Sequence, residues 1–386
     1  MGTDSVIYIR TDGNSKIATG HFVRCLCIAE ALETLGKRVC FLVSDTDSAD
    51  LLQDLSLSIF QGYSFSFDVN VLQTAVYNNL EQEQEELKYI LTQTTKPAVS
   101  PNSSVKTAVD IFHGSSATKP VIFIDSYYVT PTYLNTLRTI AKVAYMDDLR
   151  AFNYAVDLVI NYDVIPASKI TEYNLAYTNA STALLGAMYT PLRRQFQNQN
   201  TFAREKFENI LITTGGSDPY RFTETIIPYL LSQNLSITLH VVVGKLFKNT
   251  ESLEELAKQN PSVRLYYNVS DMAGLMKQCD YAVSAAGTTL YELCALGIPT
   301  ISFTMADNQI IMAETFAETG AVPYAGDLRA DDAENIKSIC NHISAHLNSL
   351  LQNPSLRIAQ QKIMHCQTDG NGAVKIAQAL CNLFSD

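Results

Sequence analysis

Largely apolar segments that end in short polar stretches recur along both halves of the chain, and those of the first half are apolar throughout. They occupy residues 6–9, 39–43, 121–124, 143–146, 158–160, 210–212, 237–243, 263–267, 281–283 and 300–303. Helix-like patterns lie between many of them, as over residues 25–35 and 290–296. A parallel strand that helices cover on both faces is typically apolar along its whole length. The pattern therefore predicts an α/β fold of two Rossmann-like, doubly wound domains in tandem, facing each other across a cleft.

Polar segments indicate where these domains meet. A proline-led polar segment at residues 191–204 interrupts the apolar pattern. We therefore expect an N-terminal domain at residues 1–190 and a C-terminal domain at residues 205–386 that ends in helices, joined by this linker. Residues 93–119 are rich in Thr, Ser and Pro, which indicates an insertion or flexible loop over part of them. The acidic residues within 81–90 are expected on the solvated face of a helix.

Length and charge narrow the classes of partner. The chain has 386 residues, enough for two domains with full cores. Its formal net charge of −11 argues against nucleic acid or an anionic membrane surface as the main partner. No apolar segment approaches the roughly 20 residues of a membrane-spanning helix, and no signal peptide is visible. We expect a cytoplasmic protein without membrane insertion.

Cysteine and histidine spacing does not indicate a metal site. The eight cysteines form no CxxC pair, and we expect them to be reduced core thiols. His342 and His346 are four residues apart, but no glutamate lies between them as in the HExxH motif. We therefore expect neither a metal ion nor another cofactor.

Residues 11–24 are the first candidate for chemistry, because they join a predicted strand to a predicted helix. Ligands of open α/β sheets bind at such carboxyl ends of strands. His21 stands where the helix should begin, and it either faces a ligand or is a surface or capping residue. Arg24 lies about one turn further along the same face, where it either binds substrate or forms a structural ion pair with Asp12.

Two acidic residues follow another predicted strand. Asp147 and Asp148 come directly after the apolar segment 143–146. Their carboxylates either bind polar groups of a ligand or cap the following helix. The sequence leaves both alternatives open.

Two loops in the second half place small residues between a strand and a helix. Residues 215–217 and 286–289 allow backbone N–H groups to approach phosphate oxygens, although glycine equally serves close packing of a loop on a sheet. Glu292 lies one turn beyond Thr288, where it accepts hydrogen bonds from a ribose or is a solvated first-turn residue. Neither the GxGxxG dinucleotide motif nor the GxxxxGK[ST] motif is present.

Together these motifs resemble the GT-B nucleotide-sugar family of MurG-like type. The chain is similar in particular to the UDP-sugar hydrolases of pseudaminic acid biosynthesis and to spore-coat polysaccharide biosynthesis proteins. The resemblance rests on IRTDGNSKIATGHFVR (9–24), FIDSYY (123–128), YMDD (145–148), YTPLRRQF (189–196), TTGGSD (213–218), SAAGTTLYE (284–292), ADNQ (306–309) and DGNGA (369–373).

The resemblance implies a set of site residues without a metal. The implied catalytic residues are His21, Tyr127 and Asn308. The implied substrate-binding residues are Asp12, Gly20, Arg24, Asp148, Gly215, Gly216, Ser217, Asp218, Ser284, Ala286, Gly287, Thr288, Thr289, Glu292 and Gln309.

The resemblance also implies an activity. It is the hydrolysis, with inversion, of the glycosidic C–O bond of a UDP-linked 2,4-diacetamido-2,4,6-trideoxy sugar, which releases UDP. An imidazole is largely neutral at neutral pH, as a general base must be. Two alternatives stay open. One is a GT-B glycosyltransferase that uses a UDP-sugar donor in surface polysaccharide synthesis, and the other is a non-catalytic UDP-sugar-binding protein.

Overall fold

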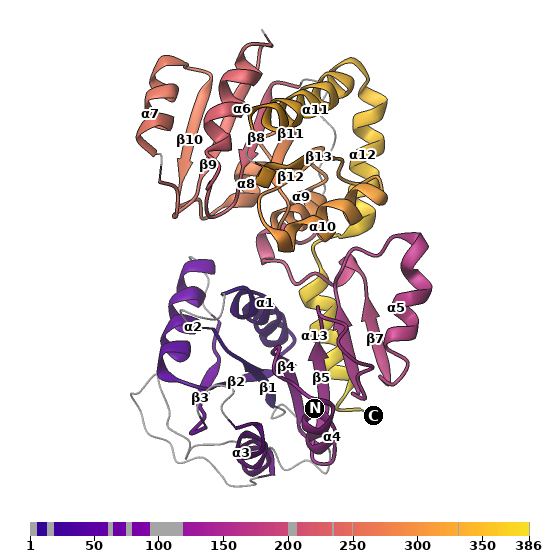
Figure 1. Cartoon of the computed structure of the whole chain (residues 1–386). Coiled ribbons are helices and arrows are strands. Elements are labelled where there is room, and N and C mark those ends of the chain that lie inside the picture. The colour runs from indigo at the N-terminus through magenta and orange to yellow at the C-terminus, as the bar shows by residue number, and fades with distance from the viewer. Residues whose placement is uncertain are drawn as a thin grey trace. The chain divides into compact units, whose positions relative to one another are not determined.

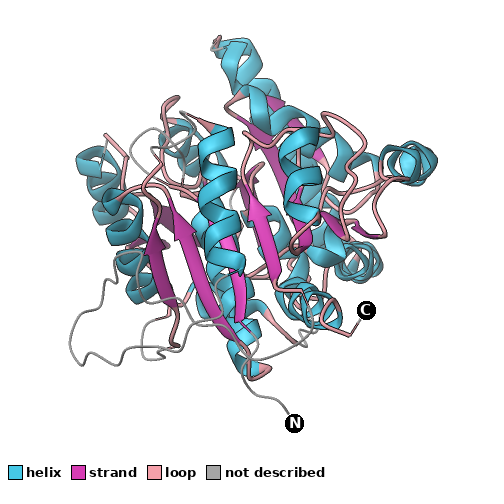
Figure 2. Cartoon of the chain, turned by 90° about the horizontal axis from the view of Figure 1, so that it is seen from below, coloured by secondary structure: helices cyan, strands magenta, loops and turns pink. Residues whose placement is uncertain are grey.

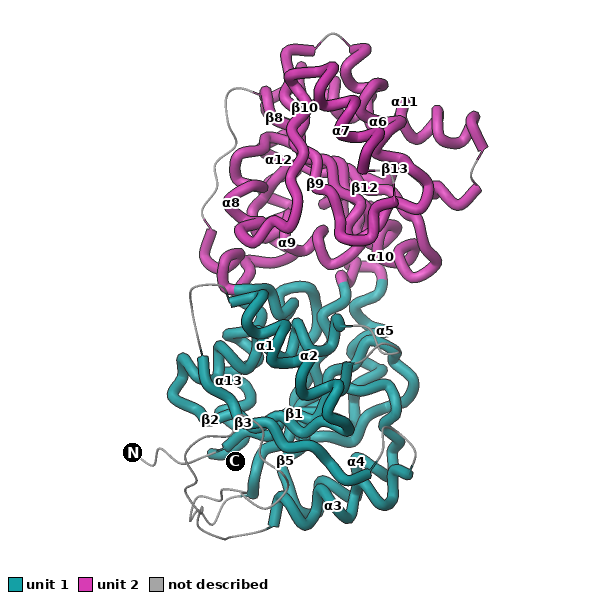
Figure 3. The backbone as a smooth tube through the Cα atoms, turned by 90° about the vertical axis from the view of Figure 1, so that its left-hand side faces the viewer, with its two compact units in different colours: residues 1–163, 169–193, 371–386 teal, residues 164–168, 194–370 magenta. Residues whose placement is uncertain are grey.

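The computed structural model describes residues 6–13, 19–60, 65–74, 79–92, 119–199, 207–233, 235–248, 250–330 and 332–385. The chain forms two compact units, which Figure 3 shows in different colours. The first unit comprises residues 1–163, 169–193 and 371–386, and the second comprises residues 164–168 and 194–370. Each unit has its own parallel sheet, so the prediction of two doubly wound sheets in tandem is confirmed.

The first unit is built on a parallel sheet with the strand order β3-β2-β1-β4-β5-β6-β7. Ile9 of β1 pairs with Phe41 of β2 on one side and with Phe123 of β4 on the other. All three side chains are fully buried, because helices lie across the strands of the sheet (Figure 2). The strands are β1 Val6–Thr11, β2 Arg38–Val43, β3 Asp68–Val71, β4 Val121–Asp125, β5 Lys142–Met146, β6 Leu158–Asn161 and β7 Thr182–Leu185.

Helices of the first unit connect these strands. They are α1 Gly20–Thr34, α2 Thr46–Ile59, α3 Leu80–Thr92, α4 Pro131–Arg138, α5 Ile170–Ala176 and, from the end of the chain, α13 Gly372–Asn382 (Figure 1). Asp45 accepts a hydrogen bond from the Ser48 backbone N–H and so caps α2, and Thr130 caps α4 in the same way. Such caps satisfy amide groups that have no partner inside the helix.

The second unit has a parallel sheet with the strand order β10-β9-β8-β11-β12-β13. Its strands are β8 Asn209–Thr213, β9 Thr238–Val243, β10 Val263–Tyr267, β11 Tyr281–Ala285, β12 Thr300–Thr304 and β13 Tyr324–Asp327. Its helices are α6 Phe222–Leu231, α7 Thr250–Gln259, α8 Met272–Met276, α9 Thr289–Leu296, α10 Asp307–Glu318, α11 Ala333–Gln352 and α12 Pro354–Gln367. No helix in the described ranges is long and apolar enough to cross a membrane.

The last helix belongs to a different unit from the one we expect. The expected C-terminal domain at residues 205–386 contains α13, whereas the structure packs α13 against α1 in the first unit. The physical reason is burial, because Ile376 and Leu380 are fully buried in the core of the first unit. Apart from residues 164–168, which also belong to the second unit, the chain leaves the first unit between Arg193 and Arg194. Part of the expected linker, residues 200–204, lies outside the described residues.

The acidic helix α3 also differs from the expectation. Glu81 and Glu85 are exposed, but Glu83 is buried. Glu83 accepts hydrogen bonds from Arg10 Nε at 2.8 Å and from the Tyr133 hydroxyl at 2.8 Å. The prediction of a solvated acidic face is therefore wrong for Glu83, because a buried arginine of β1 requires a counter-charge. The predicted insertion at 93–119 lies outside the described residues, except for Lys119.

Candidate functional site

An imidazole and a carboxylate meet at the carboxyl edge of the first sheet. His21 lies in the first turn of α1, and Asp125 is the last residue of β4, which pairs with β1. His21 Nδ1 lies 2.7 Å from Asp125 Oδ1. Asp125 is buried, and the His21 side chain reaches solvent over 9% of its surface. The predicted histidine is thus at the edge of the sheet and is paired with a carboxylate.

The charge state of Asp125 determines the tautomer of His21. Burial alone raises the pKa of Asp125, but the charge and hydrogen bonds of Arg24 outweigh it and lower that pKa well below its ordinary value. The carboxylate therefore only accepts hydrogen bonds. His21 Nδ1 carries a proton and donates it to this hydrogen bond, so the lone pair of the neutral ring is on Nε2.

Tyr127, another predicted catalytic residue, lies against this pair. Its ring meets the His21 ring edge to face, with 4.7 Å between the ring centres. Its hydroxyl lies 3.1 Å from Asp148 Oδ2. Burial and then the negative charge of Asp148 raise the pKa of Tyr127 to about 12. The phenol therefore keeps its proton at neutral pH and donates to Asp148, while half of the side chain stays exposed.

Arg24 and Asp12 do not form the ion pair that is one of the two alternatives for Arg24. Arg24 Nε instead lies 2.6 Å from Asp125 Oδ2, and Arg24 NH1 lies 2.9 Å from Asp148 Oδ2. Asp12 accepts from Arg10 NH1 at 2.5 Å and from the Ser44 backbone N–H at 2.7 Å. The reason is the strand order, because Asp12 faces β2 whereas Arg24 of α1 faces β4. Gly20 is exposed at the start of α1.

Asp147 and Asp148 have different surroundings. Asp147 is buried and accepts from the hydroxyls of Tyr154 at 2.8 Å and Tyr177 at 2.7 Å. It also accepts from the backbone N–H of Leu149 at 3.0 Å, so it stabilises a turn and does not cap a helix. Asp148 is part of the group around His21, through its contacts with Arg24 and Tyr127.

Sequence reasoning missed Asp125 as a functional candidate. The available signal was its position, because it ends a fully apolar strand at the sheet edge where ligands bind. Nothing in the local pattern shows that its partner is His21, since 104 residues separate them.

In the second unit, Gly215 and Gly216 form an exposed loop after β8. Gly215 has a φ of +81°, which glycine adopts without strain. A Cβ atom on Gly244, which follows β9, would lie 2.4 Å from the carbonyl oxygens of both loop glycines. Asp218 accepts from the backbone N–H groups of Phe222 and Thr223, each at 2.9 Å. Its carboxylate therefore stabilises the start of α6. Ser217, which precedes Asp218, is half-buried.

The second predicted phosphate loop leads from β11 into α9. A Cβ atom on Gly287 would meet open space. Across the part of the chain that the structure describes, the backbone N–H groups of Gly287, Thr288 and Thr289 donate to no protein acceptor. Three such groups at a helix N-terminus form a favourable place for an anion.

The other predicted residues near this loop have different environments. The backbone N–H of Ala286 donates to the Phe303 carbonyl at 2.8 Å, and the Ser284 hydroxyl is buried. Glu292 is half-buried in the first turn of α9. At the start of α10, Asn308 is exposed, whereas Gln309 Oε1 accepts from the Met305 backbone N–H at 2.8 Å.

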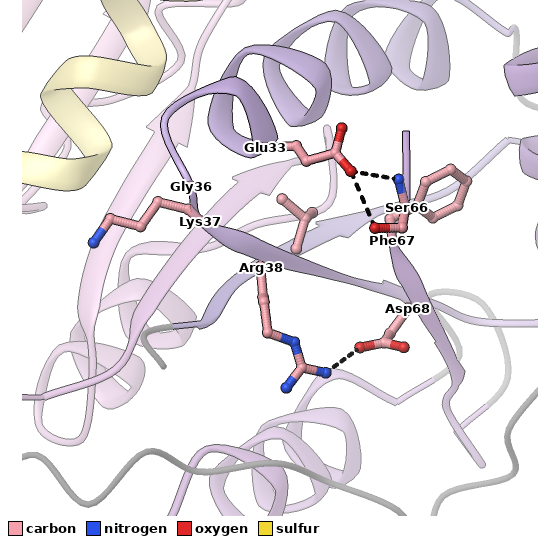
Figure 4. A pocket seen from close by; sticks show the side chains of 8 residues that line it. Glu33, Gly36, Lys37, Arg38, Ser66, Phe67 and Asp68 are labelled. Atoms are coloured by element: carbon pink, nitrogen blue, oxygen red, sulfur yellow. Dashed lines mark hydrogen bonds and ion pairs between the residues drawn. The ribbon is translucent and has the colours of Figure 1, made fainter. Parts of the chain in front are cut away.

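A cavity of about 300 Å³ lies elsewhere in the first unit, beside the amino end of β2 (Figure 4). In it Arg38 forms an ion pair with Asp68 at 2.9 Å, and Glu33 accepts from the Ser66 hydroxyl at 3.0 Å. The cavity contains no predicted site residue. Among the described residues, no cluster of three or more His, Cys, Asp or Glu side chains is arranged to hold a metal ion.

Comparison with known proteins finds one matching family model and several relatives. Residues 193–361 match the glycosyltransferase family 28 C-terminal domain. An uncharacterized protein of Methanocaldococcus jannaschii is 30% identical over 288 residues, which cover 72% of this chain and 54% of that protein. The spore coat polysaccharide biosynthesis protein SpsG of Bacillus subtilis is 27% identical over 217 residues, which cover 54% of this chain and 61% of that protein.

The name of a third relative combines two activities. It is the pseudaminic acid cytidylyltransferase and UDP-2,4-diacetamido-2,4,6-trideoxy-beta-L-altropyranose hydrolase of Helicobacter pylori, which is 27% identical over 202 residues. That match covers 51% of this chain and 34% of the relative. The resemblance to pseudaminic acid and spore-coat polysaccharide proteins is thus present along about half of the chain. In each of the three relatives the matched region is less than two thirds of their length.

Solved structures establish the fold. The crystal structure of Acinetobacter baumannii MurG has a TM-score of 0.63 at 14% identity and covers 98% of this chain and 99% of its own. A crystal structure of UDP-N-acetylglucosamine 2-epimerase has a TM-score of 0.58 at 13% identity and covers 100% and 97% of the two chains. The chain therefore has the GT-B-like fold of two Rossmann-like domains, as predicted.

Proposed function

We propose that the chain is a hydrolase of a UDP-linked 2,4-diacetamido-2,4,6-trideoxy sugar. It cleaves the glycosidic C–O bond with inversion and releases UDP and the free sugar for the synthesis of pseudaminic or a related nonulosonic acid. The observation that carries the proposal is the hydrogen bond from His21 Nδ1 to Asp125. With Nδ1 protonated against a carboxylate, Nε2 is the atom that accepts a proton from water.

The reaction is a single displacement. The oxygen of a water molecule attacks the anomeric carbon while the bond from that carbon to the diphosphate oxygen breaks. His21 Nε2 takes the proton of the water, and Asp125 stabilises the imidazolium that forms. UDP leaves with the bonding electrons, and attack opposite the leaving group inverts the anomeric centre.

The second unit is proposed to hold the nucleotide. The backbone N–H groups of Gly287, Thr288 and Thr289 receive the negative charge that develops on the diphosphate. Glu292 accepts the ribose hydroxyls, and the loop at Gly215 and Gly216 lines the same binding site. Asn308 and Gln309 contact the sugar or the diphosphate.

The Helicobacter pylori relative supports the choice of substrate, since its name includes hydrolysis of this UDP-sugar. A second candidate is a glycosyltransferase, which the family 28 match over residues 193–361 favours. In that reaction an acceptor hydroxyl replaces water, and His21 takes its proton in the same way. A UDP-sugar-binding protein without activity is the third alternative.

The test is incubation of the purified protein with UDP-2,4-diacetamido-2,4,6-trideoxy sugars and no acceptor, followed by NMR. We expect UDP and a free sugar of inverted anomeric configuration. UDP release only after an acceptor is added would identify a transferase. Absence of turnover with every acceptor, together with measurable UDP binding, would identify a UDP-sugar-binding protein without activity.

The same assay tests the base. We expect His21→Asn to lower kcat by about 10²–10⁴-fold, the usual contribution of a general base, and to leave UDP affinity unchanged. His342→Asn is the matched control, because His342 is exposed on α11 and should keep full activity. Hydrolysis by His21→Asn at the rate of the unmodified protein would show that the base is assigned wrongly.

A further inference from the structure

All three nitrogen atoms of the Arg24 guanidinium contact partners within the first unit. Its Nε and NH2 atoms contact the two oxygens of Asp125 at 2.6 and 2.5 Å. Its NH1 atom donates to Asp148 at 2.9 Å and to the Tyr162 hydroxyl at 2.6 Å. The residue is only 8% exposed. A side chain engaged in this way has no nitrogen left for a substrate.

The same guanidinium also reaches the histidine. Arg24 NH2 lies 3.0 Å from His21 Nδ1, the atom that lies 2.7 Å from Asp125 Oδ1. One nitrogen cannot donate to Asp125 and accept from Arg24 at once, and the shorter contact to the charged acceptor is the stronger bond. Arg24 is therefore a positive charge beside the imidazole, and it shares the carboxylate that holds the imidazole.

We propose that Arg24 is a positioning residue that divides the charge of Asp125 between itself and His21, and so keeps His21 neutral and competent as a base. This inference rests on the proposed role of His21 and adds a function for its neighbour. It replaces the expectation that Arg24 binds substrate.

The physical reason is charge balance in a buried site. Without Arg24, a protonated His21 is the only cation that the described residues place in contact with the buried Asp125 carboxylate. An unpaired buried carboxylate is costly, so the pair captures a proton on the imidazole. A neighbouring like charge disfavours the charged form of a group, and a charge at such short range typically moves a pKa by about 1–3 units. Removing the positive charge of Arg24 should therefore keep His21 protonated, and inactive as a base, to higher pH.

Other ionisable groups surround this pair. Tyr127, after β4, contacts the His21 ring and donates to Asp148, after β5. Cys25 of α1 lies 3.4 Å from Asp125 Oδ2, and burial raises the pKa of its thiol well above the ordinary value. Tyr162, after β6, contacts Arg24. Burial also raises the pKa of Tyr162, so these three groups stay neutral near pH 7. Among the described residues, Arg24, Asp125 and Asp148 are the charged groups around His21.

The experiment compares Arg24→Met and Arg24→Lys with the unmodified protein. Rates of UDP release are measured from pH 5 to 9. The titration of the His21 ring is followed by NMR of histidine-labelled protein without substrate, with His21→Asn used to assign its signal. Arg38→Met is the control, because Arg38 also forms an ion pair in the first unit, with Asp68, but at the amino end of β2.

We expect Arg24→Met to move the acidic limb of the kcat profile and the His21 titration midpoint upward by about one pH unit or more. At pH 7 its kcat should fall at least tenfold and recover in part toward pH 9. Arg24→Lys keeps the charge, so its acidic limb should stay within about half a pH unit. Arg38→Met should change neither quantity.

Two results would overturn the inference. One is an Arg24→Met or Arg24→Lys protein that raises KM more than tenfold at unchanged kcat, which is the signature of substrate binding. The other is an unchanged His21 midpoint in a folded Arg24→Met protein. If Arg24→Met does not fold, the KM, kcat and midpoint of Arg24→Lys decide. Because the NMR titration needs no substrate, it also separates a failure of this inference from a failure of the proposed hydrolysis.

Discussion

The first unit contains two groups of buried charged residues, and the two groups have different roles. Arg10, Asp12 and Glu83 are all buried, and their charged atoms contact one another or neighbouring polar groups. This group ties β1 to β2 and α3, and each of its three residues is at most 2% exposed. The group of His21, Arg24 and Asp125 is also buried, but it places a titratable ring at the sheet edge. At the residue scale, partial exposure of His21 separates a candidate site from a structural ion pair.

The structural group carries its own prediction. Glu83→Gln removes one of the two carboxylate partners of Arg10 and should lower the free energy of unfolding by about 3–5 kcal/mol, the usual cost of breaking a buried ion pair. Glu85→Gln, on the exposed face of the same helix, should change it by less than about 0.5 kcal/mol. Urea unfolding at pH 7 measures both. Equal effects of the two variants would mean that the Arg10–Glu83 pair contributes no stability.

At the element scale, the sequence pattern identifies the interior strands of both sheets but not β3, β7 and β13. Those three strands lie at sheet edges, where a strand is less covered and need not be apolar throughout. In β7 the first two residues are exposed and the last two are half-buried. The sequence also identifies the loops that follow interior strands, because glycine, histidine and acidic residues are concentrated there.

The glycine loop after β8 depends on a neighbouring element. Gly244→Ala places a Cβ atom 2.4 Å from the carbonyl oxygens of Gly215 and Gly216, so the loop must shift. We expect a loss of about 1–3 kcal/mol of stability and a UDP affinity that is at least about tenfold weaker. Thermal unfolding and calorimetric titration with UDP measure the two effects.

Gly216→Ala is the matched control for stability, because its Cβ atom would have no neighbour within 4 Å. It should unfold at the temperature of the unmodified protein. If Gly244→Ala binds UDP with full affinity although its stability falls, the loop after β8 does not take part in nucleotide binding.

At the scale of the whole molecule, the chain returns to its first unit after completing the second. α13 lies beside α1 and completes the hydrophobic core around β1 and β4. Gly372, its first residue, would bring a Cβ atom to 2.1 Å from the Thr190 carbonyl oxygen. This close approach requires glycine where the chain re-enters the first unit. The first unit is therefore incomplete without residues that are distant in the sequence.

A core variant of α13 tests this organisation. Leu380→Ala should destabilise the first unit by about 2–5 kcal/mol, because it leaves a cavity at a fully buried position. Hydrogen exchange should accelerate in α1 and β1 and stay unchanged in β8 and α9. Leu356→Ala on α12, where the side chain is 45% exposed, is the control. Faster exchange confined to the second unit would contradict the assignment of α13 to the first.

The sequence by itself determined the two parallel sheets, most of their interior strands and the loops that carry His21, Tyr127, the glycines and Asn308. It did so because burial on both faces of a sheet imposes a local apolar pattern, and because ligand-binding residues follow the strands in that pattern. Only the tertiary structure decided which charges pair. Arg24 and Asp125 are 101 residues apart, and Arg10 and Glu83 are 73 apart. Such partners depend on the order of strands in the sheet, which no local pattern records. The return of α13 to the first unit likewise depends on packing between segments that are distant in the sequence.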